Sequence, residues 1–74
     1  MLQNEGVAPM PTEPLYAPPT VAEHLGLSVQ ALALMRHEGT GPAYVKLGRR
    51  VRYRMSEVES WLDANTVTTS GGAA

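Results

Sequence analysis

Positive charge is concentrated in one short stretch of this sequence. Residues 45–54, VKLGRRVRYR, hold all but one of the six lysine and arginine residues of a 74-residue chain whose formal net charge is −1. Guanidinium and ammonium groups at this density can bind phosphates, because each neutralises a negative charge and donates hydrogen bonds to its oxygens. The stretch from Arg36 to Arg54 contains a single acid, Glu38, so it carries a local positive field that the net charge conceals. The alternative is a solvated strand whose cations only prevent edge-to-edge aggregation.

The composition excludes several other kinds of site. The chain has no cysteine, and its two histidines, His24 and His37, fall on separate expected helices without neighbouring ligands, so we expect no disulfide and no metal site. No apolar run approaches the roughly 18 residues of a membrane span, and the N-terminus lacks the basic start and apolar middle of a signal peptide. No nucleophile motif or phosphate-cradling glycine loop is present. We therefore expect a cytoplasmic protein that is not an enzyme, with no cofactor and no membrane partner.

Two short helices are expected before the basic stretch. Thr20 can cap the first, in TVAEHLG, with Glu23 completing a capping box and Gly26 ending the helix. Pro18 and Pro19 favour a helix start, which leaves its first residue open by two or three positions.

The second helix, in LSVQALALMRHEG, has Ser28 as its cap and Gly39 as its end. Its wheel places one set of side chains inward, namely Val29, Leu32, Met35 and the stem of Arg36, and another set outward, namely Gln30, Leu34 and His37. Two helices joined by a tight glycine turn predict a helix-turn-helix.

The basic stretch itself alternates in a way that predicts two antiparallel strands joined at Gly48. A two-residue loop, 48–49, would set the apolar residues of the first strand beside arginines of the second. A three-residue loop, 48–50, pairs Leu47 with Val51 and Val45 with Tyr53, giving one apolar face, and we predict this register for that reason. The opposite face would carry Tyr44, Lys46, Arg52 and Arg54, with Arg49 and Arg50 at the tip.

A third helix, in SEVESWLDAN, is expected to start at the cap Ser56, with Glu59 as its capping-box partner. Trp61 should anchor the core, since burying an aromatic of that size stabilises by roughly 3 kcal/mol or more. The predicted fold is α+β, a small winged helix-turn-helix of three helices with a two-stranded antiparallel hairpin wing between the second and third. It spans residues 15–65, between a flexible N-terminal arm (1–14) and a disordered C-terminal tail (66–74).

Individual side chains of the second helix and the wing have alternative interpretations. Gln30 can read adenine through two hydrogen bonds, or be an ordinary exposed glutamine. Leu34 is a thymine-methyl contact, a partner contact or plain surface, and His37 contacts a phosphate or only solvent. Arg36 packs its stem inward while its guanidinium reaches a phosphate or caps a helix end. Tyr53 is assigned to the core, whereas the Tyr44 hydroxyl can support a phosphate contact.

The stretches VAEHLGLS, EGTGPAYVKLG, RYR and WLDAN closely resemble the small winged helix-turn-helix family of phage excisionases and prophage regulators, which is related in fold to the MerR-type DNA-binding domain. The resemblance implies a DNA-bending protein whose helix after Ser28 enters a major groove and whose wing tip, residues 48–50, reaches the adjacent minor groove. It also implies three partners: double-stranded DNA at attachment-site repeats, a phage integrase, and further copies that bind cooperatively. The residues expected to contact DNA are Ser28, Gln30, Ala31, Leu34, Arg36, His37, Tyr44, Lys46, Arg49, Arg50, Arg52 and Arg54.

The sequence departs from this family at several positions. Family members often have threonine at the position of Ala17, so the first helix here is expected to start nearer Thr20. They also often carry basic residues at the positions of Leu34 and His37 and an aromatic at that of Met35, so affinity should depend more on the wing and on adjacent copies. The leading hypothesis is an excisionase that directs integrase toward excision. The alternatives are a prophage-type transcriptional regulator and a protein-interaction module with a basic hairpin.

Overall fold

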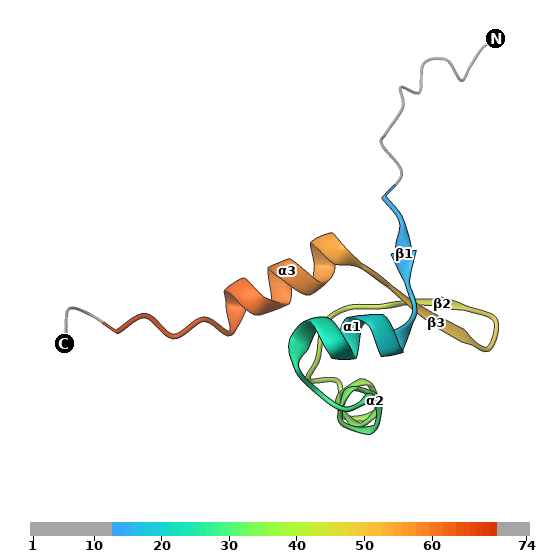
Figure 1. The fold of residues 1–74 in the computed structure, drawn as a ribbon, viewed down its shortest axis with the longest axis horizontal. Helices are drawn as coiled ribbons and strands as arrows, with labels where there is room; N and C mark the ends of the chain where they lie inside the picture. Colours follow the sequence, from blue (N-terminus) through green and yellow to red (C-terminus); the bar gives the residue numbers. More distant parts are fainter. Residues whose placement is uncertain (1–12, 70–74) are drawn as a thin grey trace, which may run out of the picture.

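The computed structural model describes residues 13–69, which form three helices and a three-stranded antiparallel sheet (Figure 1). In chain order the elements are β1 (Leu15–Tyr16), α1 (Pro18–Leu25), α2 (Val29–Glu38), β2 (Val45–Leu47), β3 (Arg50–Arg54) and α3 (Met55–Ala64). This order confirms the predicted α+β winged helix-turn-helix. The prediction lacked β1, which pairs with β3 on the edge away from β2. Of the predicted arm and tail, residues 1–12 and 70–74 lie outside the described part of the chain.

The hairpin of β2 and β3, the wing, projects from one side of the domain, and α3 extends from the other (Figure 1). Helices α1 and α2 lie together on one side of the sheet, with α1 closer to it (Figure 1). No helix within residues 13–69 is long and apolar enough to cross a membrane.

The ends of the first two helices show which local signals prevailed. Helix α1 begins at Pro18 after the cap Ala17, whose carbonyl accepts from the N–H groups of Thr20 and Val21. The prediction that Thr20 caps this helix is therefore wrong, because proline at the first position needs no N–H partner and has its φ already set. At the other end, Gly26 has φ 72°, and hydrogen bonds from Gly26 and Leu27 to Glu23 and Ala22 form a Schellman motif. Gly39 ends α2 in the same way at φ 73°, as predicted.

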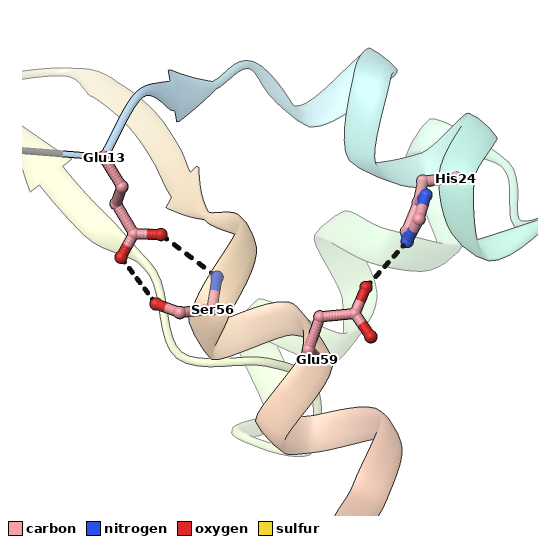
Figure 2. Close-up of polar contacts among 4 residues, drawn as sticks. All are labelled: Glu13, His24, Ser56 and Glu59. Atoms are coloured by element: carbon pink, nitrogen blue, oxygen red, sulfur yellow. Dashed lines mark hydrogen bonds and ion pairs between the residues drawn. The ribbon is translucent and has the colours of Figure 1, made fainter.

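Helix α3 begins two residues earlier than predicted, with its cap position at 54 instead of 56, and its first turn is bonded by a distant part of the chain. Its cap position is Arg54, which makes no side-chain capping bond, and Ser56 lies inside the first turn. The Glu13 carboxylate accepts hydrogen bonds from the Ser56 N–H at 3.2 Å and hydroxyl at 2.6 Å (Figure 2). Glu59, the predicted capping-box partner, instead lies 3.3 Å from His24 Nε2 on α1 (Figure 2). Both predicted roles are therefore wrong, since the strand runs directly into α3 and leaves no free position for a serine cap.

The register of the wing also differs from the prediction. Val45 pairs with Arg52, Lys46 with Val51 and Leu47 with Arg50, which leaves the two-residue loop 48–49. Gly48 has φ 63°, and every residue with a positive φ within 13–69 is a glycine. Positive φ at the first of two loop residues is typical of a type II′ hairpin turn, whereas a three-residue loop places its left-handed residue last, where this chain has Arg50. Turn chemistry therefore outweighed the pairing of apolar residues.

The core is small and centred on one tyrosine. Its fully buried side chains are Val21, Ala22, Leu32, Tyr53 and Val58. Tyr53 is the largest of these, so its assignment to the core is confirmed. The prediction that Trp61 anchors the core is wrong: the indole is half-buried at the edge, where its Nε1 donates to the Thr40 carbonyl at 3.0 Å. An indole N–H needs an acceptor when it is covered, and the loop after α2 supplies one at the edge of the domain.

Candidate nucleic-acid interface

Helix α2 is held at both ends by its own sequence. The Ser28 hydroxyl accepts a hydrogen bond from the Ala31 N–H at 3.0 Å, which satisfies one of the free donors of the first turn. These two members of the predicted contact set therefore have a structural role in starting the helix. The exposed first turn still presents backbone N–H groups with the positive end of the helix dipole, which favours an anion such as a phosphate.

The exposed face of α2 carries the three side chains predicted to point outward. Gln30, Leu34 and His37 are all exposed, and their spacing places them along one line of the helix. Leu34 is 54% exposed, whereas Leu32, two residues earlier, is fully buried against the core. Val29 is 41% exposed, so its predicted inward position is wrong; it lies in the first turn, beyond the reach of the small core. The stripe thus combines an amide, an apolar group and an imidazole.

The cations of the wing lie on two faces and a tip. Because side chains alternate along a strand, Arg50, Arg52 and Arg54 lie on the face of the sheet opposite to Tyr53. Directly paired residues of neighbouring strands share a face. Lys46 lies with Val51 on the Tyr53 face, and Arg49 is in the loop beside Gly48. The predicted single face of Tyr44, Lys46, Arg52 and Arg54 does not exist, because the two-residue loop shifts β2 by one position relative to β3.

No carboxylate within residues 13–69 forms an ion pair with any of these wing cations, since the one ion pair there is His24–Glu59. Arg52 donates from Nη1 to the Val51 carbonyl of its own strand at 2.7 Å. Arg54 lies near Glu13, whose pKa is lowered below the usual 4.5, mainly by the hydrogen bonds from Ser56 and also by the Arg54 charge. The wing therefore presents a concentrated positive field to solvent.

Arg36 differs from the other predicted contacts. Its Nη1 donates to the Tyr53 hydroxyl at 2.9 Å, and its guanidinium carbon lies 6.0 Å from the centre of the Tyr44 ring. The Tyr44 and Tyr53 rings are themselves 6.1 Å apart, at 53° to each other. The three side chains therefore form a cluster between the end of α2 and the base of the wing, which we call the Arg36 cluster.

Two interactions near the interface could not be inferred from spacing. Arg36 and Tyr53 lie 17 positions apart, and Glu13 and Ser56 lie 43 positions apart. Neither pair has a local signal, since each depends on strands and helices that the tertiary fold brings together. Within residues 13–69, no three histidine or acidic side chains are grouped in a way that could hold a metal ion.

Comparison with known proteins assigns a family to this arrangement. A family described as a helix-turn-helix domain matches residues 15–66, which is more than half of the chain and includes both helices, the wing and α3. No curated protein matches the chain. The matched segment starts at β1 and ends just after α3, so it coincides with the folded domain.

Proposed function

Because the chain belongs to this helix-turn-helix domain family, we propose that it is a DNA-binding protein that acts as a phage excisionase. It would bind repeated sites beside an attachment sequence, bend the duplex, and direct an integrase toward excision without performing a chemical step itself. It would act on DNA in the cytoplasm of a bacterial host. The resemblance of VAEHLGLS, the segment entering the wing and WLDAN to phage excisionases supports this finer assignment.

The observation that carries the DNA-binding part of the proposal is the free positive charge of the wing. Within residues 13–69, Lys46 and the wing arginines form no ion pair with a carboxylate, so each can neutralise a phosphate without first breaking one. If the tip of the wing enters a groove first, the two faces of the wing lie beside the phosphates on the two walls of the groove. The division of the cations between two faces therefore suits an approach led by Gly48 and Arg49.

Helix α2 would supply the sequence-dependent contacts in an adjacent major groove. Gln30 lies in its first turn, where an amide can bond the N6 and N7 of adenine, and the exposed Leu34 can contact a thymine methyl group. His37 would lie at the rim of the groove, near the phosphates. So short a reading surface gives limited affinity, which favours several copies that bind side by side and cooperate.

Footprinting on DNA around the neighbouring integrase gene tests the assignment. We expect protection of repeated sites beside the attachment sequence, cooperative occupancy, and bending in a circular-permutation mobility assay. Protection of a single operator beside a promoter would instead make the protein a transcriptional regulator. In an excision assay with the integrase, the protein should raise excision and lower integration, and no effect on either reaction would refute the excisionase proposal.

Salt dependence tests the electrostatic mechanism separately. Five phosphate contacts predict that the logarithm of affinity falls against the logarithm of salt concentration with a slope of about −4 to −5. Asp63→Asn is a matched control, because Asp63 is an exposed residue of α3. Helix α3 and the wing extend from opposite sides of the domain (Figure 1). This variant should leave the slope unchanged. A wild-type slope near zero would remove the wing from the interface.

One observation favours a second candidate function, a protein-interaction module. On the face of the sheet opposite Tyr53, Leu15 pairs with Arg54 and Leu47 with Arg50, and the two leucines are 40% and 50% exposed. Leucines beside arginines suit an acidic, partly apolar protein surface better than phosphates alone. The double variant Arg50→Ala with Arg52→Ala separates the two functions. Retained DNA binding together with loss of a complex with the integrase would favour the interaction module.

A further inference from the structure

We propose that Arg36 is a positioning residue that fixes the wing relative to α2, rather than a phosphate contact. This inference rests on the proposed DNA-binding function, and it assigns the Arg36 cluster the task of setting the spacing between the two DNA-contacting elements. Arg36 lies in the last turn of α2, while Tyr44 precedes β2 and Tyr53 lies in β3. One guanidinium thus contacts both sides of the base of the wing.

The hydrogen bond to Tyr53 joins the Arg36 guanidinium to the buried core. Tyr53 has no exposed surface, so its hydroxyl cannot touch DNA, and its hydrogen-bond partner within residues 13–69 is Arg36 Nη1. A buried hydroxyl left without a partner is costly, and a charged donor makes the bond stronger than a neutral one. Arg36 is itself half-buried, unlike the exposed Arg49 and Arg50. Its guanidinium is therefore directed toward the base of the wing.

The Arg36 guanidinium also lies beside Tyr44, the residue that precedes β2. The guanidinium carbon lies 6.0 Å from the Tyr44 ring centre, at the limit of a cation–π interaction, and the Tyr44 ring is tilted against that of Tyr53. Within residues 13–69, no carboxylate forms an ion pair with Arg36 and competes for the guanidinium. The three side chains therefore restrain one another.

The restraint matters because α2 has little other connection to the wing. The backbone of α2 lies mainly against α1, and α1 in turn lies against β3, so side chains make the direct link from α2 to the wing. Two elements that must contact adjacent grooves bind more weakly if their spacing varies, because only the fraction of molecules with the correct spacing is competent. Loss of the Arg36 cluster should therefore lower affinity without removing a contact to DNA.

The test uses Tyr53→Phe, Arg36→Met and the double variant in titrations of a footprinted DNA site at several salt concentrations. Tyr53→Phe deletes one buried oxygen, and Arg36→Met keeps an apolar stem. Tyr16→Phe is the matched control: Tyr16 pairs with Tyr53 across the sheet, and its hydroxyl makes no hydrogen bond within residues 13–69. Thermal melts establish that each variant is folded at the temperature of the titration.

We expect Tyr53→Phe and Arg36→Met each to weaken binding about tenfold with an unchanged salt slope, and the double variant to be no weaker than Arg36→Met. Tyr16→Phe should bind like the wild type. A phosphate contact would behave differently: Arg36→Met would make the slope shallower by about 0.9, and Tyr53→Phe would bind normally. That result would overturn the inference. Should Arg36→Met fail to fold, Tyr53→Phe alone decides between the two outcomes.

A measurement without DNA separates this inference from the proposed function. The chain has no cysteine, so Gln30→Cys with Arg49→Cys gives two unique sites for spin labels, one on α2 and one at the wing tip. We expect Tyr53→Phe to broaden the distribution of distances between the labels. An unchanged distribution would refute the positioning role even where DNA binds, whereas a protein that fails to bind DNA but shows the broadening would refute the proposed function alone.

Discussion

Replacement of Gly48 tests the two-residue loop on which the geometry of the wing depends. Gly48→Ala places an L side chain at φ 63°, and nothing lies within 4 Å of the position that its Cβ would take. The cost is therefore that of the left-handed backbone conformation alone, about 1–2 kcal/mol. Gly48→Asn should cost less, because asparagine adopts this conformation more readily than alanine.

Urea denaturation measures this cost directly, and a thermal melt should fall by about 4–8 °C per kcal/mol for a domain of this size. Gly26→Ala is a matched control, since Gly26 has φ 72° and equally open surroundings but lies in the turn between α1 and α2. Gly26→Ala should lower the free energy of unfolding by about as much as Gly48→Ala does. The two variants should differ in DNA binding, because Gly48→Ala also disturbs the wing tip.

Arg50→Gly distinguishes the two-residue loop from a three-residue loop. In a three-residue loop, the left-handed residue would be Arg50, so glycine there would stabilise the protein and Gly48→Ala would be tolerated. With the two-residue loop, residue 50 begins β3, and glycine should destabilise it by roughly 0.5–1 kcal/mol. A stabilising Arg50→Gly together with a neutral Gly48→Ala would show that the loop is longer than two residues.

Further expectations concern α2, the cap of α3 and the wing charges. Leu32→Ala should lower the free energy of unfolding by about 3–5 kcal/mol because the side chain is fully buried, whereas the exposed Leu34→Ala should change it by less than about 0.5 kcal/mol and weaken DNA binding instead. If urea denaturation showed the same loss of unfolding free energy for both leucine variants, the orientation of α2 would be contradicted. The lowered pKa of Glu13 means that its stabilisation is complete above its usual pKa of 4.5 and is lost as the pH falls through the lowered value. Glu13→Ala should therefore be less stable than the wild type at neutral pH and equal to it in strong acid, and a difference that persists in acid would exclude the carboxylate as its source. Lys46→Gln and Arg49→Gln should each make the salt slope of DNA binding shallower by about 0.9, and an unchanged slope would remove that cation from the interface.

Local signals in the sequence determined much of the fold. Ser28, Gly26 and Gly39 set ends of α1 and α2, because caps and left-handed glycines act through bonds within a few residues. The alternation of residues 45–54 predicted a hairpin, and the charge of this stretch predicted where positive potential would concentrate. The outward stripe of Gln30, Leu34 and His37 followed from helical periodicity alone.

Tertiary structure decided the features that depend on distant residues or on competition between signals. The register of the wing followed the backbone preference of Gly48 rather than the pairing of apolar residues, because a small sheet has too little core contact from β2 to reward that pairing. The cap of α3 came from Glu13, and the partner of Arg36 proved to be the Tyr53 hydroxyl. Tyr53, and not Trp61, became the centre of the core, because β3 passes between both edge strands and contacts α1 and α3. Such contacts join segments whose separation along the chain carries no periodic signal, so they exist only once the chain has folded.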